Sequence, residues 1–154
     1  MLLGGYPLAK VMEPIKGGDD SRVLSKLAGD RMPKALLVSV VDDDQFFRAS
    51  IGRLVTSLGY AVEDFVSAAA FLASTRLAET ACLIADVHMP KMSGVELYKH
   101  LIDMGLSFPT ILVTGRPDDV ERKHALDDGV VCYLSKPIKE ERLIQCLRLA
   151  LQSG

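Results

Sequence analysis

The sequence predicts an α/β fold, namely a doubly wound, five-stranded parallel sheet with helices on both faces. Five short apolar runs alternate with segments of helical periodicity, and this alternation is typical of successive βαβ units. Four of these runs lead into an acidic, hydroxyl or basic side chain. Because ligands bind beyond the carboxyl ends of the strands in such sheets, we expect these polar residues to form one site.

The first half of the expected fold comprises three strands and two helices. Strand Ala35–Val41 is a nearly continuous apolar run, and the helix after it spans about Asp44–Leu58. The residues that form the apolar stripe of this helix are Phe46, Phe47, Ile51, Leu54, Val55 and Leu58. Tyr60–Phe65 is expected as the second strand, Ser67 caps a short alanine-rich helix, and Ala81–Asp86 is the third strand.

The second half of the expected fold continues the alternation. Ser93 starts a helix that ends near Gly105, and its apolar residues are Val95, Leu97, Leu101 and Ile102. Pro109–Val113 is the fourth strand, and helix Pro117–Asp127 after it is rich in charge and poor in large apolar residues. The last two elements are strand Val130–Leu134 and helix Glu140–Leu151, with Leu143, Ile144, Leu147 and Leu151 facing inward.

Composition and charge exclude several classes of protein. The chain is 49% hydrophobic and 25% charged, as is usual for a globular domain, and its net charge of −2 gives no electrostatic footprint for nucleic acid. No apolar stretch reaches the roughly 18 residues that a membrane span needs. The first residues also lack the pattern of a signal peptide. We therefore expect a cytoplasmic protein that binds neither nucleic acid nor a membrane directly.

The residues before the alternating pattern are expected to lie outside the folded domain. Glycine and proline interrupt Met1–Lys34 repeatedly, which predicts a disordered extension before a domain at residues 35–152. A docking segment, or upstream sequence from a misassigned start, is the alternative. The three cysteines, Cys82, Cys132 and Cys146, lie in apolar patterns without metal-ligand spacing. We expect all three to be small buried thiols in a reducing compartment.

The polar residues at the strand ends indicate phosphoryl transfer. Asp42, Asp43 and Asp86 would crowd three carboxylates together, and this arrangement is repulsive unless a cation neutralises it. Oxygen ligands favour a hard ion, Mg²⁺ or Mn²⁺. Lys136 offers a compact charge and Thr114 a hydroxyl donor to phosphoryl oxygens. A carboxylate beside such a metal can act as a nucleophile towards phosphorus, and Asp86 is the candidate acceptor.

Four motifs occur in a fixed order along the chain. They are Val40-Val41-Asp42-Asp43, the run from Ile84 to Gly94 with Asp-x-x-Met-Pro-x-Met-x-Gly inside it, Val113-Thr114-Gly115 and Ser135-Lys136-Pro137. From about Ala35 to Leu151 the chain resembles a response-regulator receiver domain of two-component signalling, most of all receivers joined to helix-turn-helix output domains. The resemblance implies a flavodoxin-like sheet of order 2-1-3-4-5 and a histidine kinase or phosphotransfer protein as phosphodonor.

The resemblance also implies a set of metal ligands. Asp43 and Asp86 would bind Mg²⁺ (or Mn²⁺) directly, Asp42 would bind it through water, and His88 would contribute its backbone carbonyl. The alternative register, Asp43 with Asp44, is shifted by one residue. Asp44 is better placed to cap the first helix, which favours the first register.

By the same resemblance, Thr114 senses the phosphoryl group and Tyr133 is the switch aromatic. Lys136 contacts the phosphoryl group, and its peptide bond to Pro137 is usually cis in the family. The surface formed by the last two predicted helices and the strand between them would change on phosphorylation. That surface would bind a downstream protein or a second copy of the chain.

Three other functions are alternatives to this interpretation. A haloacid-dehalogenase-type phosphatase would use the acidic residues after the first strand with Thr114 and Lys136. It needs another acidic pair at a later strand end, and after Lys136 the sequence has only Glu140-Glu141, which open a helix. It also leaves Asp86 unexplained. A flavin-binding protein would need a phosphate loop where three aspartates would repel phosphate. A degenerate receiver used for protein contacts is a further alternative. We expect no enzyme activity beyond self-phosphotransfer and autodephosphorylation on Asp86.

Overall fold

The computed structural model describes residues 34–152. The predicted extension, Met1–Lys34, falls almost entirely outside the described residues and stays a prediction. The strands are β1 Leu37–Val41, β2 Ala61–Phe65, β3 Thr80–Asp86, β4 Thr110–Thr114 and β5 Cys132–Ser135. The helices are α2 Gln45–Ser57, α3 Ala68–Leu72, the short 3₁₀ helix η2 Leu77–Glu79, α4 Gly94–Asp103, α5 Asp119–Asp127 and α6 Glu140–Gln152.

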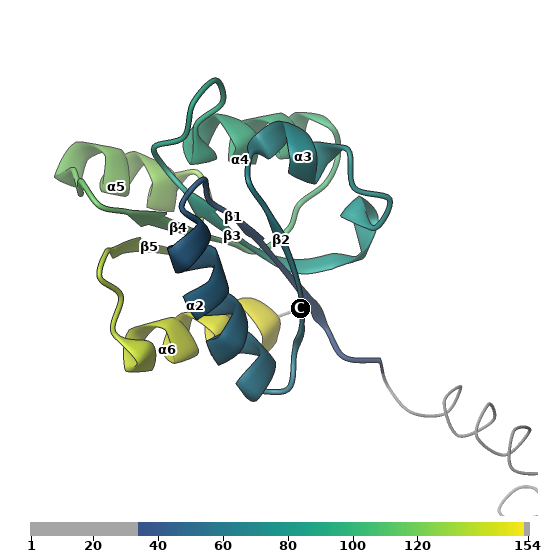
Figure 1. The fold of residues 1–154 in the computed structure, drawn as a ribbon. Coiled ribbons are helices and arrows are strands. Elements are labelled where there is room, and N and C mark those ends of the chain that lie inside the picture. The colour runs from purple at the N-terminus through teal and green to yellow at the C-terminus, as the bar shows by residue number, and fades with distance from the viewer. Residues whose placement is uncertain (1–33, 153–154) are drawn as a thin grey trace, which may run out of the picture. The chain divides into compact units, whose positions relative to one another are not determined.

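The five strands form one parallel sheet of order β2-β1-β3-β4-β5, so the predicted fold class and strand order are confirmed. Figure 1 shows the sheet between two helical layers, with α2 and α6 on one face and α3, α4 and α5 on the other. Because every strand points the same way, all carboxyl ends lie along one edge. Among the described residues, no helix is long and apolar enough to cross a membrane.

Each face of the sheet has its own hydrophobic cluster. The cluster under α2 and α6 is mostly aliphatic and includes Ile51 and Val55 of α2 with Leu143 and Leu147 of α6. The cluster under α3, α4 and α5 holds more aromatic side chains, among them Phe71, Tyr98, Phe108 and Tyr133. There are two clusters because helices cover both faces of a parallel sheet. The strands are therefore apolar on both sides, which explains their continuous apolar sequences.

Local capping accounts for where the helices begin. The Asp44 side chain accepts from the backbone N–H groups of Phe46 and Phe47, so Asp44 is the N-cap of α2, as expected. Ser67 caps α3, also as expected. Helix α5 starts two residues later than predicted because Asp118 is its N-cap. The Asp118 side chain accepts from the backbone N–H groups of Val120 and Glu121.

Some expected boundaries and burials are wrong. β1 begins two residues after Ala35, and β5 begins two residues after Val130, whose N–H donates instead to a carbonyl at the end of α5. The sequence predicts Phe46 in the apolar stripe of α2, yet 84% of its surface is exposed. Leu58, at the end of the same stripe, is also exposed. The stripe is narrower than the sequence suggests because Ile51 and Val55 already cover the sheet beneath α2.

The prediction of three free thiols is wrong for two cysteines. Cys132 of β5 and Cys146 of α6 form a disulfide, with their Cα atoms 6.2 Å apart, within the usual range for such bonds. The packing of α6 on β5 brings them together, and this proximity cannot be read from a spacing of fourteen residues in a chain. Cys82 is a free buried cysteine, as expected, and burial raises the pKa of its thiol to about 12.

Candidate functional site

Three carboxylates meet at the carboxyl edge of the sheet. Asp86 is the last residue of β3, and Asp42 directly follows the neighbouring strand β1, whose Val41 is paired with Ala85. The parallel register therefore places Asp42 and Asp86 side by side. One carboxylate oxygen from each of Asp42, Asp43 and Asp86 lies within 4.8 Å of the other two. Asp42 is fully buried, Asp86 is 6% exposed, and Asp43 is open to solvent.

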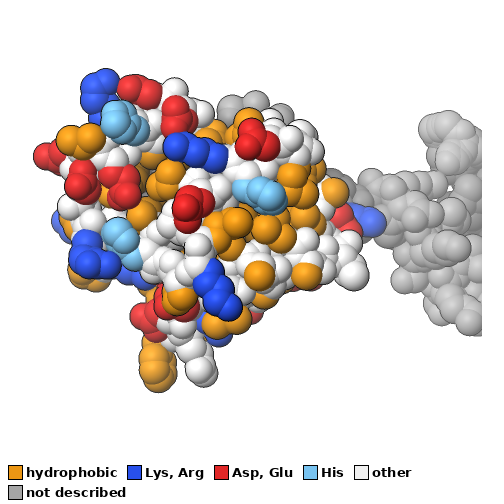
Figure 2. Space-filling view, turned by 90° about the horizontal axis from the view of Figure 1, so that it is seen from above, with side chains coloured by type: hydrophobic (Ala, Val, Ile, Leu, Met, Phe, Trp, Pro, Cys, Tyr) orange, Lys and Arg blue, Asp and Glu red, His pale blue; other side chains and the backbone are white. Residues whose placement is uncertain are grey.

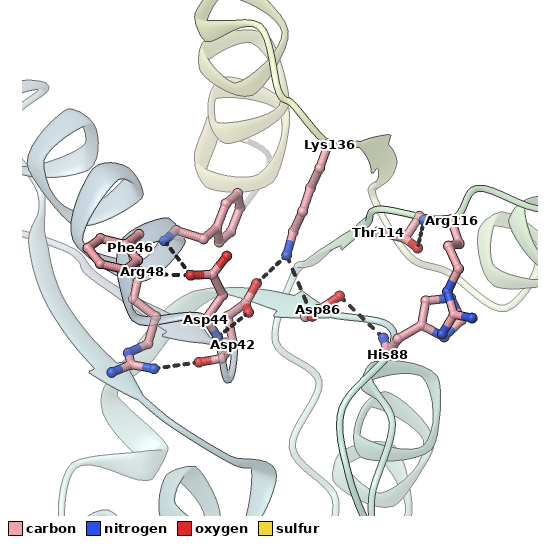
Figure 3. Close-up of polar contacts among 10 residues, drawn as sticks. Asp42, Asp44, Phe46, Arg48, Asp86, His88, Thr114, Arg116 and Lys136 are labelled. Carbon is pink, nitrogen blue, oxygen red and sulfur yellow. Dashed lines mark hydrogen bonds and ion pairs between the residues drawn. The ribbon is translucent and has the colours of Figure 1, made fainter.

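Lys136 supplies the positive charge of the cluster. Its Nζ donates to Asp42 Oδ2 at 2.7 Å and forms an ion pair with Asp86 Oδ2 at 3.6 Å, as Figure 3 shows. Burial by itself lowers the pKa of the Lys136 ammonium, but the hydrogen bond and charge of Asp42, with Asp86, outweigh burial and raise that pKa. The Lys136–Pro137 peptide bond is cis, as the resemblance implied.

The environment of Asp86 disfavours its charge. Burial, and next the charge of Asp42, raise the pKa of the Asp86 carboxyl above its usual value, while Lys136 and the His88 N–H oppose this shift. The Lys136 ammonium therefore pairs with two of the three clustered carboxylates, those of Asp42 and Asp86. Oxygen ligands in this arrangement fit a hard divalent cation, which would offset the remaining negative charge.

The loop after β3 is shaped around Asp86. The His88 N–H donates to Asp86 Oδ1 at 3.2 Å, and the His88 side chain is exposed. Gly94 opens α4 so close to the strand that a Cβ atom there would collide with the Asp86 carbonyl oxygen. Ser93 caps the same helix through a capping box with Glu96. The glycine and the cap together hold the loop against the end of β3.

Thr114 lies on the opposite side of Asp86 from Asp42 (Figure 3). It is the last residue of β4, one position beyond the residue paired with Asp86, and it is fully buried. Its hydroxyl oxygen accepts from the Arg116 N–H at 3.0 Å. The paired ends of β4 and β5 also connect Thr114 to Lys136, because the Lys136 N–H donates to the Thr114 carbonyl at 2.8 Å.

Tyr133 of β5 is buried and bonded to α5. Its hydroxyl donates to Glu121 Oε1 at 2.6 Å and accepts from the Asp118 N–H at 3.2 Å. Burial and the hydrogen bond to Glu121 raise the pKa of the Tyr133 phenol to about 12. The phenol thus joins β5, the strand that directly precedes Lys136, to the first turn of α5.

The structure therefore brings Asp42, Asp43, Asp86 and Lys136 together and places Thr114 and His88 beside them. Sequence reasoning missed two contacts. The Lys136 Nζ lies 4.2 Å from the centroid of the Phe47 ring, and Glu121 binds the Tyr133 hydroxyl. The sequence predicts Phe47 only as one residue of an apolar stripe, and no sequence signal separates it from Phe46.

Comparison with known proteins gives one consistent family. The family profile described as the response regulator receiver domain matches residues 38–148. The response regulator protein TodT of Pseudomonas putida is 35% identical over 119 residues, which cover 77% of this chain and 52% of TodT. The transcriptional regulatory protein FixJ of Azorhizobium caulinodans is 38% identical over 120 residues, covering 78% and 57%.

Solved structures agree with the sequence relatives. The crystal structure of FixJ-N aligns with a TM-score of 0.69 at 33% identity and covers 80% of this chain and 98% of that one. The chemotaxis protein CheY4 of Vibrio cholerae aligns with a TM-score of 0.70 at 26% identity, covering 77% and 100%. The chain spans about half the length of the curated relatives it matches.

Proposed function

The chain belongs to the response regulator receiver domain family, and from this premise we propose that Asp86 accepts a phosphoryl group from a histidine kinase or a phosphotransfer protein. The observation that carries the proposal is the position of Asp86, a nearly buried carboxylate 3.6 Å from the Lys136 ammonium and within reach of two further carboxylates. Family membership favours this function over the phosphatase and flavin alternatives.

The carboxylate cluster is proposed to work with Mg²⁺ (or Mn²⁺). Asp43, Asp86 and the backbone carbonyl of His88 would hold the cation directly, and Asp42 would do so through water. When bound, the cation offsets negative charge on the carboxylates and on the phosphoryl group in transfer. The three oxygen-bearing side chains and the raised pKa of the Asp86 carboxyl support this assignment.

The residues of the chain then have separate roles in the transfer. An Asp86 oxygen attacks phosphorus in line, a P–O bond forms, and the P–N bond of the donor phosphohistidine breaks with its electron pair leaving on nitrogen. The Lys136 ammonium offsets charge on a phosphoryl oxygen. Later attack by water on phosphorus breaks its bond to the Asp86 oxygen, which releases inorganic phosphate and returns Asp86 to its free form. We propose no catalysis on a separate substrate.

Signalling is proposed to pass through Thr114 and Tyr133. A phosphoryl oxygen on Asp86 would accept from the Thr114 hydroxyl, which would give up its bond to the Arg116 N–H. The space so vacated lets Tyr133 move and release its contacts with the first turn of α5. The changed surface of α5, β5 and α6 would bind a downstream protein or a second copy of the chain in the cytoplasm.

Phosphorylation of Asp86 is tested with acetyl phosphate and Mg²⁺. We expect one acid-stable, base-labile phosphoryl group by intact mass, lost with EDTA or in Asp86→Asn and severely reduced in Asp43→Asn. Asp44→Asn is the matched control, because Asp44 caps α2 and asparagine is a comparable N-cap, so this variant should keep both its stability and its labelling. A wild-type protein that stays unlabelled is a degenerate receiver, and label that persists in Asp86→Asn moves the acceptor elsewhere.

The Thr114 role is tested by amide hydrogen exchange with and without beryllofluoride. In wild type we expect protection to change in α5 and β5 when the phosphoryl mimic binds. Thr114→Ala removes the hydroxyl but none of the carboxylates, so it should still be phosphorylated and show a much smaller change in α5. Equal changes in both proteins would show that the signal bypasses Thr114.

A further inference from the structure

We infer that Phe47 is a positioning residue that holds the Lys136 ammonium over the carboxylate cluster through the face of its ring. The inference rests on the proposed function, because Lys136 must meet the phosphoryl group on Asp86. It adds to that function a residue of α2 that touches none of the reacting atoms and acts through the lysine.

The geometry of Lys136 shows why a third contact matters. The ammonium is 2.7 Å from Asp42 Oδ2 and 3.6 Å from Asp86 Oδ2, so it is held closer to the carboxylate that does not accept the phosphoryl group. The Phe47 ring lies on a further side, 4.2 Å from Nζ to its centroid, which is within the range of cation–π attraction. The Lys136 side chain is 21% exposed, so solvent weakens but does not abolish this attraction.

An aromatic face suits this task better than another hydrogen-bond acceptor. Lysine has three N–H donors on a flexible four-carbon stem, and each acceptor that binds it takes one donor. The ring attracts the whole charge without fixing the direction of any N–H bond. Phe47 therefore confines the ammonium near the cluster and leaves its donors free to pass from Asp42 to a phosphoryl oxygen on Asp86.

The start of α2 fixes the ring in place. Asp44 accepts from the Phe47 N–H at 3.3 Å, which sets the first turn of the helix, and the Phe47 side chain packs partly against the cluster under α2 and α6. Phe46 has the same side chain, the same helix and the same cap, but it is 84% exposed. The two phenylalanines therefore form a matched pair, of which Phe47 is the one whose ring contacts the Lys136 ammonium.

The rate of phosphorylation by acetyl phosphate with Mg²⁺ measures the effect. We expect Phe47→Leu, which keeps apolar bulk but removes the ring, to slow the reaction about fivefold, the size expected for loss of one partly exposed cation–π contact. Phe47→Tyr keeps the ring face and should stay close to wild type, as should Phe46→Leu. Phe47→Met serves as a second ring-free variant if the leucine variant does not fold.

A second measurement uses the protein without metal or phosphodonor. In wild type and Phe47→Tyr, the NMR signals of the Lys136 Cε–H groups should be displaced by the ring current, whereas in the ring-free variants they should return towards ordinary lysine positions. Equal rates for Phe47→Leu and wild type, or equal losses for Phe47→Leu and Phe47→Tyr, overturn the inference. A wild type that is not phosphorylated at all overturns the proposed function instead, and the NMR signals then still decide whether the ring holds Lys136.

Discussion

Helices α5 and α6 stand on either side of the last part of the sheet, and they are held by different means. Helix α6 has four buried residues, Leu143, Cys146, Leu147 and Ala150, and a disulfide joins it to β5. Helix α5 has one buried residue, Ala125, and of its two large apolar residues Val120 is 64% exposed and Leu126 is partly buried. Burial of apolar surface therefore stabilises the position of α6 far more than that of α5.

Hydrogen bonds from polar side chains partly replace the apolar burial that α5 lacks. The Tyr133 hydroxyl joins β5 to the first turn of α5, and the Tyr98 hydroxyl of α4 donates to the Asp128 carbonyl at the other end. Figure 2 shows charged side chains gathered over the side of the molecule where α5 lies. Each of these hydrogen bonds at the two ends of α5 can be exchanged for one to water at a net free-energy cost of about 1 kcal/mol. Helix α5 is therefore the element suited to move, and α6 is the element suited to stay in place.

The largest expected effect is loss of packing under α6. Leu143 is fully buried between α6 and the sheet, so Leu143→Ala should lower the free energy of unfolding by about 3 kcal/mol through lost burial and the cavity left behind. Urea unfolding monitored by circular dichroism measures the change. The control on α5 is Val120→Ala, which should change the free energy by less than about 0.5 kcal/mol. Similar costs for the two substitutions would contradict the comparison.

An effect of similar size is expected from loss of the disulfide. It closes a loop with a sequence separation of fourteen, for which chain entropy gives a stabilisation of about 3 kcal/mol before any native strain is subtracted. Urea unfolding with and without reductant should show that loss. Thiol titration of the unfolded, unreduced protein should find one thiol, that of Cys82, whereas three thiols would show that α6 lacks the covalent tie.

Most of the fold was predictable because strong local patterns agree with the tertiary structure. Every predicted strand and helix after Lys34 is present, and the strand ends do bring Asp42, Asp86 and Lys136 to one edge. The errors lie where tertiary contacts decide. Phe46 and Phe47 look alike in the sequence, yet the position of Lys136, far along the chain, gives one of them a partner.

The disulfide and the α5 contacts escaped prediction for the same reason. Nothing in the spacing of Cys132 and Cys146 shows that α6 packs back onto β5 with these residues facing each other. Likewise, Glu121 reads as one of several charged residues on a polar helix until the fold brings it to the Tyr133 hydroxyl. Side-chain pairing across elements depends on packing that a periodic pattern does not encode.

The smallest expected effect is that of the Tyr133 hydroxyl. Tyr133→Phe keeps the ring but removes the hydrogen bonds to α5, so it should lower the free energy of unfolding near neutral pH by about 1 kcal/mol.

The pKa of the Tyr133 phenol rises from 10.0 to about 12 in the folded protein, because burial and Glu121 favour the neutral form. A group whose pKa is raised by folding stabilises fully below its unfolded pKa and loses that contribution as the pH rises through the folded value. The difference between wild type and Tyr133→Phe in urea unfolding should therefore be constant up to about pH 10 and shrink above it. A difference that persists unchanged at higher pH would mean that the hydroxyl does not tie α5 to β5, and α5 would then need another restraint.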